Sequence, residues 1–368
     1  MHGQRLFIKH ILRPSKSKGM VTLMPIRVLI VDDSVLFRTK MQLSLSDNDI
    51  TVVGSAANTT EAMQKILELN PDVVTLDVEM PGMSGIDFLK ELLPRKSVPV
   101  VVVSSLPINA LDALDAGAVD FVRKPVAGVP NAQENFLQEM REKIKIASKA
   151  KVRPFPARTA RPEGLFKTAP DIKVKKDIVI AIGASTGGTE AIIEVVKDLP
   201  PSTPGILVVQ HMPANFTRLY AQRLDKICKM EVKEAADYDR VFPGRIILAA
   251  GDYHMTLKKD ADGYYIRSRP GEKVSGHCPS VDVLFDSVAE TVGKNAIGVL
   301  LTGMGADGAK GLLKIRRQGG YTIGQDKESC VVYGMPMEAK KLGAVVKELP
   351  IDQIAGEIVN YLAKKNKN

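Results

Sequence analysis

The segment Ile26-Arg-Val-Leu-Ile-Val31-Asp32-Asp33-Ser34 is the clearest indication of the architecture of the first part of the chain. A mostly apolar run ends abruptly in two carboxylates and a hydroxyl, the pattern of a buried strand whose end carries polar groups. Similar runs lie at 51–53, 73–76 and 99–103, and helix-like segments lie between them at 34–46, 60–69 and 85–93. Short apolar strands that alternate with helices predict a parallel sheet covered on both faces, in a domain of about 25–145.

The C-terminal half of the chain shows the same alternation. Its apolar runs lie at 177–182, 205–209, 245–249, 296–301 and 320–323, with helical segments near 188–198, 281–293 and 309–318. The pattern predicts a second α/β domain, doubly wound and mostly parallel, over 177–365. Ligands of such sheets bind outside the carboxyl ends of the strands, so the residues that follow each run are the candidates for function.

A basic segment lies between the two predicted domains. The chain has 368 residues and a net charge of +9, and residues 141–176 hold twelve Lys and Arg against three Asp and Glu, which is 12 − 3 = +9. The remainder is therefore close to neutral, which argues against binding to nucleic acid. Four prolines accompany the charges, at positions 154, 156, 162 and 170. We expect a solvated basic linker at 146–176.

The ends of the chain and its cysteines bear on where it acts. No apolar stretch of about 18 or more residues is present, so we expect nothing embedded in a membrane. Residues 1–24 are basic and lack the apolar region and cleavage site of a leader, so we expect a disordered extension or a misassigned start. The three cysteines have no paired C-x-x-C spacing, which favours neither disulfides nor zinc and fits the cytoplasm.

Carboxylates gather at the strand ends of the first domain. Asp32 and Asp33 follow the first strand and Asp77 follows the third, so the three can converge on one edge of the sheet. Such a cluster is costly without a cation, and oxygen ligands of this kind suit Mg²⁺. Ser104 and Lys124, after later strands, add a hydroxyl and a compact positive charge. The set predicts Mg²⁺-assisted phosphoryl transfer to an aspartate.

A possible nucleophile lies at the start of the second domain. Ser185, in Gly-Ala-Ser185-Thr-Gly, matches G-x-S-x-G between a strand and a helix, a turn that exposes the hydroxyl at a helix N-terminus. Of the histidines after the linker, His211, His254 and His277, only the first directly follows a strand, and Asp307 lies beyond another strand end. The order Ser…His…Asp differs from that of α/β-hydrolases, although triads are defined by geometry rather than order.

Motifs alone leave other interpretations of the second domain open. Ser185 can be explained as a helix cap, and His211 as a structural histidine. The segment 303–308 also matches G-x-G-x-x-G after a strand, and Asp326 lies where a ribose-binding acid is expected. From these motifs, a hydrolase and a nucleotide-dependent enzyme both remain possible.

The first domain resembles a response-regulator receiver domain. The motifs that carry the resemblance are Val-Leu-Ile-Val-Asp32-Asp33-Ser34, Leu-Asp77-Val-Glu79-Met-Pro81-Gly-Met-Ser-Gly85, Val-Ser104-Ser and Phe121-Val-Arg-Lys124-Pro125. The resemblance implies a flavodoxin-like five-stranded parallel sheet with Asp77 as the phosphorylated residue. It also implies that Ser104 and Lys124 contact the phosphoryl oxygens and that Phe121 is the aromatic switch.

The same resemblance implies the ligands of the metal ion. Asp33, Asp77 and the carbonyl of Glu79 are expected to hold Mg²⁺, and Asp32 is expected to order its water molecules. A chemotaxis histidine kinase is the implied phosphodonor. Adding a charge near −2 at Asp77 is expected to shift a two-state element.

The second domain resembles the chemotaxis protein-glutamate methylesterase family. The motifs that carry this resemblance are Gly-Ala-Ser185-Thr-Gly-Gly, Val-Gln-His211-Met-Pro, His277-Cys-Pro-Ser280-Val-Asp-Val-Leu-Phe, Leu-Thr-Gly-Met304-Gly-Ala-Asp307-Gly and Ser329-Cys-Val-Val-Tyr-Gly-Met-Pro. Together with the receiver, the likeness runs from about 25 to 362, apart from much of the linker. It implies that Ser185 is the nucleophile, His211 the base and acid, and Asp307 the residue that orients His211. The N–H of Met304 is implied in the oxyanion hole, with Thr186 in support.

The implied function is hydrolysis of glutamate γ-methyl esters on methyl-accepting chemoreceptors, with release of methanol, together with glutamine deamidation. The resemblance implies control by phosphorylation and no cofactor for the esterase, and we expect a monomer. Ala306 and Ala250 depart from the family pattern, which expects an amide side chain and a proline there. The alternative from another class is a phosphorylation-controlled adaptor whose second domain is not catalytic.

Overall fold

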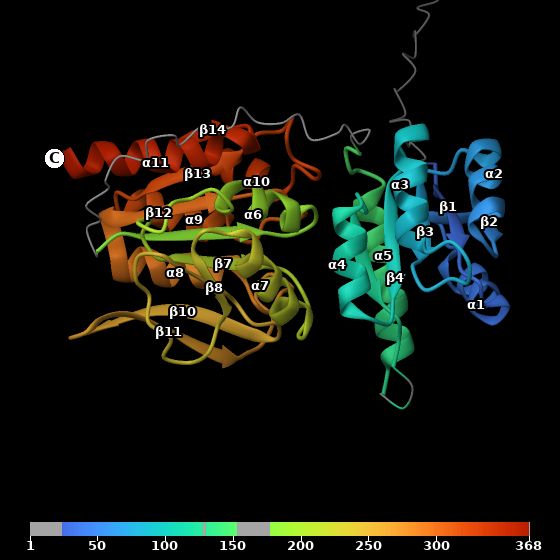
Figure 1. Cartoon of the computed structure of the whole chain (residues 1–368), viewed down its shortest axis with the longest axis horizontal. Helices are drawn as coiled ribbons and strands as arrows, with labels where there is room; N and C mark the ends of the chain where they lie inside the picture. Colours follow the sequence, from blue (N-terminus) through green and yellow to red (C-terminus); the bar gives the residue numbers. More distant parts are fainter. Residues whose placement is uncertain (1–23, 127, 129, 153–176, 368) are drawn as a thin grey trace, which may run out of the picture.

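The protein consists of two α/β domains joined in sequence, as the computed structural model shows (Figure 1). The structure describes residues 24–126, 128, 130–152 and 177–367. Residues 1–23 of the expected extension and 153–176 of the expected linker lie outside the described residues. Among the described helices, none combines the length and the apolar character needed to cross a bilayer.

The first domain is built on a five-stranded parallel sheet with the order β2-β1-β3-β4-β5. Its strands are β1 (Ile26–Val31), β2 (Ile50–Ala56), β3 (Val73–Asp77), β4 (Val100–Ser104) and β5 (Asp120–Arg123). Strands β3 and β4 are buried along their whole length, which explains their continuous apolar sequences. The predicted fold class of this domain is confirmed.

Five helices cover the two faces of this sheet: α1 (Val35–Leu45), α2 (Thr59–Leu69), α3 (Gly85–Arg95), α4 (Pro107–Asp115) and α5 (Ala132–Ala147). Polar residues after the strands start three of them. Ser34 caps α1 by accepting the Phe37 N–H at 3.3 Å, and Asn58 and Ser84 cap α2 and α3 in the same way.

The second domain holds a seven-stranded sheet with the order β14-β13-β12-β6-β7-β9-β8, in which neighbouring strands run parallel. Its strands are β6 (Val179–Ala184), β7 (Ile206–Gln210), β8 (Glu231–Glu234), β9 (Arg245–Leu248), β12 (Ala296–Leu300), β13 (Tyr321–Gln325) and β14 (Lys347–Leu349). Strand β6 is central, with β7 on one side and β12 on the other. The predicted doubly wound, mostly parallel domain is confirmed.

Helices again flank the sheet: α6 (Gly188–Val196), α7 (Phe216–Ile227), α8 (Val281–Val292), α9 (Ala309–Arg317), α10 (Met335–Lys341) and α11 (Ile351–Lys367), with a 3-10 turn η1 (Gly293–Asn295) after α8. A separate antiparallel hairpin, β10 (Tyr253–Asp260) and β11 (Gly263–Pro270), packs against α8. The sequence did not predict β8, β14 or the hairpin. The edge strands β8 and β14 are short and charged, so they lack the apolar run of the inner strands.

The two domains contact each other along one side of the first domain. Figure 1 shows α4 and α5 on the side of the first domain that faces the second. Helix α4 packs against α6 and α7 of the second domain. Because α6 begins just after Ser185, this arrangement brings the first domain close to the proposed nucleophile.

Candidate active site and phosphoacceptor site

Ser185 occupies the turn between β6 and α6. The turn closes with Gly187, at φ 74°, and α6 begins at Gly188, so the serine lies at a helix N-terminus as predicted. Its backbone N–H donates to the Thr302 carbonyl at 3.0 Å, which ties the turn to the end of β12. The residue is buried, with 8% of its surface exposed. The described residues offer its hydroxyl no hydrogen bond, which leaves the oxygen available for chemistry.

His211 is placed beside Ser185 by the register of two neighbouring strands. Ala184 of β6 pairs with Gln210 of β7, and the serine and the histidine are the next residues on each strand. The His211 N–H donates to the Ala184 carbonyl at 3.1 Å. In the ring, Nε2 lies 2.8 Å from Oδ2 of Asp307, while Nδ1 is buried with no partner among the described residues.

Asp307 reaches His211 from the loop between β12 and α9. Its carboxylate also accepts the Ser280 hydroxyl at 2.8 Å and the backbone N–H groups of Val281 and Asp282 at 2.7 and 3.0 Å. Burial acts to raise the pKa of Asp307, but the hydrogen bonds from His211 and these N–H groups outweigh it and hold the pKa below its ordinary value. The N-terminus of α8 therefore keeps Asp307 ionised and fixed.

His277 and Ser280 join this site, although neither was assigned a role from the sequence. The His277 ring stacks on that of His211, with centroids 3.7 Å apart and planes at 14°. Burial and the neighbouring His211 lower the pKa of His277 to about 4, so its ring is neutral near pH 7. Ser280 both caps α8 and donates to Asp307. The sequence feature that could have pointed to these two residues is the motif His277-Cys-Pro-Ser280, to which no role was assigned.

The loop after β12 supplies the candidate oxyanion donor. Met304 lies in this loop, half-buried, and its N–H makes no hydrogen bond to any residue that the structure describes. Thr186 is buried beside Ser185, and its carbonyl accepts the Thr302 hydroxyl at 3.0 Å. A backbone N–H without a partner among the described residues, such as that of Met304, suits an oxygen that becomes negative during a reaction.

Close packing accounts for glycines of the G-x-G-x-x-G segment. A Cβ at Gly303 would lie 2.4 Å from Sδ of Met335 and 2.7 Å from Cβ of Ser185. A Cβ at Gly308, which has φ 86°, would lie 2.5 Å from a methyl carbon of Val281. These glycines let the loop run against the nucleophile turn and α8, which explains the motif without a dinucleotide.

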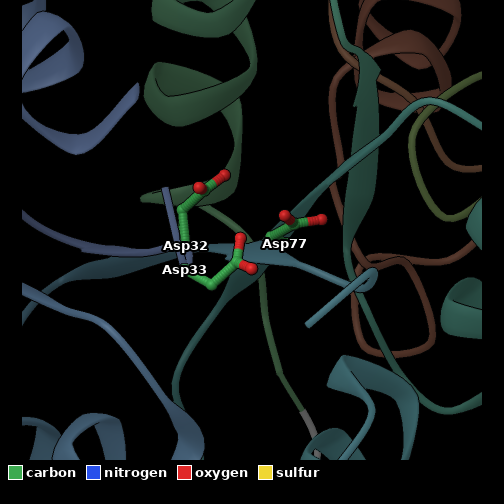
Figure 2. A group of neighbouring side chains, drawn as sticks. All are labelled: Asp32, Asp33 and Asp77. Carbon is green, nitrogen blue, oxygen red and sulfur yellow. The ribbon is translucent and has the colours of Figure 1, made fainter. Parts of the chain in front are cut away.

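The predicted acidic cluster forms at the strand ends of the first domain. Figure 2 shows Asp32, Asp33 and Asp77 with their carboxylates turned toward a common space, and one oxygen from each lies within 4.8 Å of the others. Burial is the largest influence on Asp32 and raises its pKa. Lys124 Nζ lies 2.6 Å from Asp77 and 3.2 Å from Asp32. A set of three close carboxylate oxygens fits Mg²⁺.

Ser104 and Glu79 pair with each other near this cluster. The Ser104 hydroxyl donates to Oε1 of Glu79 at 3.0 Å, and the Glu79 carboxylate is not part of the group of three aspartates. The predicted metal ligand of this residue is its carbonyl, which the contact leaves available. Phe121 is buried, with 6% of its surface exposed, and stacks on Phe216 of the second domain at 4.5 Å between centroids. The expected switch residue thus contacts the other domain directly.

A carboxylate of the first domain lies against the nucleophile turn. Oδ2 of Asp120, at the start of β5, accepts the Thr186 hydroxyl at 2.5 Å. Lys143 of α5 donates to both oxygens of Asp120 at 2.9 Å. Burial acts to lower the pKa of Lys143, but Asp120 outweighs it and raises this pKa. The neighbour of Ser185 is therefore covered by a charged pair from the first domain.

Further contacts surround this pair. Arg223 of α7 pairs with Asp112 of α4 at 3.5 Å and with Asp115 of the same helix. After α5, the Lys151 N–H donates to the Val331 carbonyl at 2.9 Å. The interface between the domains thus extends on both sides of Ser185.

Two family models match the chain. Residues 180–358 match the CheB methylesterase family, and residues 28–130 match the response regulator receiver domain. The solved CheB methylesterase catalytic domain of Thermotoga maritima aligns with 38% identity and a TM-score of 0.50, over 51% of this chain and all of that one.

Relatives over the full length have the same two-part names. A protein-glutamate methylesterase/protein-glutamine glutaminase 2 of Syntrophomonas wolfei is 51% identical over 332 residues, which are 89% of this chain and 95% of that protein. One of Syntrophotalea carbinolica is 49% identical over 349 residues, 92% of this chain and 98% of that protein. The similarity therefore includes both domains and their order.

Proposed function

Because the chain belongs to the CheB methylesterase family, we propose that it hydrolyses glutamate γ-methyl esters on methyl-accepting chemoreceptors and deamidates receptor glutamines. The observation that carries this is the His211–Asp307 pair beside Ser185, at the ends of adjacent strands. The names of the full-length relatives favour this enzyme over the adaptor. Release of methanol from a methylated receptor tests it, and a folded chain that releases none would favour the adaptor.

The acylation step follows from the geometry of the three residues. Nε2 of His211 is held by Asp307, so Nδ1 is the nitrogen that accepts the Ser185 proton. The serine oxygen attacks the γ-carbonyl, and the negative oxygen that forms is stabilised by the Met304 N–H. Collapse of the intermediate breaks the bond to the methoxy group, which leaves as methanol with the proton from His211.

The second half-reaction uses the same groups with water. His211 takes a proton from water, which attacks the acyl carbon; the bond from that carbon to Oγ of Ser185 then breaks, His211 returns the proton to Oγ, and the glutamate carboxylate is released. A glutamine side chain passes through the same acyl-enzyme, with ammonia leaving in place of methanol. Each residue therefore acts in the same way in ester hydrolysis and in deamidation, and the esterase steps need no cofactor.

The receiver site supports phosphorylation of Asp77. Asp33, Asp77 and the Glu79 carbonyl would hold Mg²⁺, which neutralises charge on a transferring phosphoryl group, and Asp32 would order its waters. Asp77 then attacks the phosphorus of the donor, for which a histidine kinase is the natural source. Lys124, 2.6 Å from Asp77, and Ser104 would bind the phosphoryl oxygens.

Control of the esterase follows from where the first domain sits. A phosphoryl group on Asp77 draws the Ser104 hydroxyl away from Glu79, and Phe121, on the next strand, lies against Phe216 of the second domain. A shift of Phe121 loosens the contact that covers Thr186 and Ser185. Phosphorylation therefore exposes the active site. We place this cycle in the cytoplasm and in a monomer, and the free thiols of Cys228, Cys278 and Cys330 suit that compartment.

Asp77→Asn should abolish labelling by a phosphodonor. With acetyl phosphate and Mg²⁺, the wild-type chain gains the mass of one phosphoryl group, because the Asp77 carboxylate is the acceptor and the metal balances its charge. The variant gains none, and a chelator prevents the gain in the wild type. Intact-mass spectrometry measures both.

Asp87→Asn is the matched control for that experiment. Asp87 lies in α3 and its carboxylate bonds to the exposed cap residue Ser84, outside the acidic cluster. This variant should be labelled as the wild type is. Labelling of Asp77→Asn to the wild-type extent would show that another residue is the acceptor.

Arg223→Glu should raise methanol release in the absence of a phosphodonor by about fivefold. The change replaces two ion pairs across the interface by repulsion from Asp112 and Asp115, so the covering domain dissociates more often. The rate with phosphodonor should rise little, since phosphorylation already opens the site. Initial rates with and without acetyl phosphate measure the ratio.

Arg218→Glu controls for charge on the same helix. Arg218 is exposed on α7 and has no ion pair with any described residue, so this variant should keep the wild-type ratio. Adding Asp112→Arg and Asp115→Arg to Arg223→Glu makes the charges across the interface attractive again. This triple variant should regain the wild-type ratio of rates with and without acetyl phosphate. An unchanged ratio in Arg223→Glu itself would mean that this interface does not limit access.

A further inference from the structure

A cavity of about 570 Å³ lies beside the nucleophile turn. Met304 and Ala306, from the loop after β12, form one wall, and Val332 and Met337, from the segment after β13, form another. Apart from the Met304 backbone, the proposed esterase chemistry uses none of these groups. A cavity that starts at the proposed oxyanion donor is in a position to bind part of the substrate.

The sheet order decides which part of the substrate lies there. Ser185 follows the central strand β6, and His211 follows β7 on one side of it. The methoxy oxygen must lie near His211 to receive its proton, so the leaving group points toward β7. The cavity residues of the second domain follow β12 and β13, on the opposite side of β6, whereas Lys149 and Lys151 follow α5 of the first domain. The acyl chain and the polypeptide that bears it therefore extend toward the cavity.

The chemistry of the cavity points to an apolar side chain between acidic neighbours. Its wall is formed largely by methionine, valine and alanine, and its volume exceeds that of one leucine side chain. Lys149, Lys151 and Lys327 also line it, and so does Glu338, which pairs with Lys341. Lys151 pairs with Glu328, while Lys149 and Lys327 are exposed and have no ion pair with carboxylates of the described residues. A substrate whose esters become carboxylates complements these charges.

We propose that this cavity is a substrate subsite: its second-domain wall binds an apolar side chain within one helical turn of the modified glutamate, with Lys327 contacting flanking carboxylates. The inference rests on the proposed function and adds which polypeptides the enzyme prefers. Ala306 lines the cavity with a small side chain, at the position where the family pattern expects a larger amide side chain.

The test uses the full-length protein with Mg²⁺ and acetyl phosphate. Synthetic peptides carry one glutamate γ-methyl ester and a leucine at successive neighbouring positions, in an otherwise alanine context, and methanol release gives kcat/KM. Leucine at one position should raise kcat/KM about tenfold over alanine. Ala306→Leu fills the cavity and should reduce that preference to about twofold or less. Ala261→Leu, in the exposed turn of the β10–β11 hairpin, should retain it.

A second pair of variants tests the charged rim. Lys327→Glu should lower kcat/KM for peptides with flanking glutamates about fivefold more than Lys310→Glu does. Lys310 is exposed on α9 and does not line the cavity. These changes alter exposed side chains, so they test the subsite even if Ala306→Leu does not fold.

N-Acetylglutamate γ-methyl ester separates the two levels of the proposal. If it is hydrolysed and leucine has no effect at any peptide position, or the preference survives Ala306→Leu, the subsite is overturned and the esterase stands. If neither this ester nor any peptide releases methanol, the proposed function fails and the subsite fails with it.

Discussion

Ser185→Ala should reduce methanol release about 10⁶-fold, to the level that binding and the oxyanion donor alone sustain. The variant lacks the oxygen that attacks the ester, while His211 and Asp307 keep their contact. Its fold should be unchanged, because the serine is held through its backbone N–H to Thr302 and its hydroxyl bonds to no described residue. Methanol release from a methylated receptor, with phosphodonor present, measures the loss.

Two controls accompany this variant. Ser202→Ala removes a half-buried hydroxyl elsewhere in the second domain and should leave the rate at the wild-type level. Labelling of Asp77 by acetyl phosphate should survive in Ser185→Ala, since that chemistry belongs to the first domain. Hydrolysis by Ser185→Ala at the wild-type rate would mean that another residue is the nucleophile.

Asp307→Asn should lower kcat about 10⁴-fold while the protein stays folded. Asp307 accepts from Nε2 of His211 and from the N-terminus of α8, with Ser280 among its donors. The asparagine side chain has the same shape, but one of its two acceptor oxygens is replaced by an NH₂ group, which donates to Nε2 of His211. The histidine then favours the tautomer with its proton on Nδ1, and the nitrogen that should accept the serine proton is blocked.

Asp286→Asn is the matched control for that substitution. Asp286 lies on α8 and pairs with Lys314 near the surface, so its loss should change kcat by less than about twofold. Thermal unfolding of both variants checks the fold. If Asp307→Asn kept a kcat within about tenfold of the wild type, the contact between Asp307 and His211 would not be what fixes the histidine tautomer.

Much of the fold could be predicted because the inner strands are buried throughout. Strands such as β4 and β6 are continuous apolar runs, and such runs can be recognised as buried strands from the sequence. The edge strand β8, Glu-Val-Lys-Glu, is charged and short, so nothing in its sequence distinguishes it from a loop. The β10–β11 hairpin was missed for a related reason, since its strands are buried on one face only and carry lysine and arginine among their other residues.

The part of the proposed site that could be predicted consists of residues that follow neighbouring strands. Ser185 and His211 follow paired strands, so the parallel sheet alone brings them together. Asp307 could be placed only at a strand end, because its distance from His211 depends on how the loop crosses the N-terminus of α8. His277 stacks on His211 from a loop far along the chain, and no local pattern predicts a contact of that kind.

Sequence patterns did not predict the contacts between the two domains. Asp120 is the first residue of β5 and belongs to no motif of the receiver site, yet its carboxylate bonds to Thr186 beside the nucleophile. Its partner Lys143 is one of many basic residues near the linker, and only the fold shows it half-buried against Asp120. The surfaces of both domains determine these pairs, and a single sequence does not display them.

Control of the esterase by phosphorylation of Asp77 can be tested by comparing the wild type with Asp77→Asn. Methanol release from methylated receptors is measured for both proteins, with and without acetyl phosphate and Mg²⁺. A phosphorylation-controlled esterase predicts that the phosphodonor raises the wild-type rate and leaves Asp77→Asn at the unstimulated rate. Equal stimulation of both proteins, or none in either, would contradict control of Ser185 through Asp77.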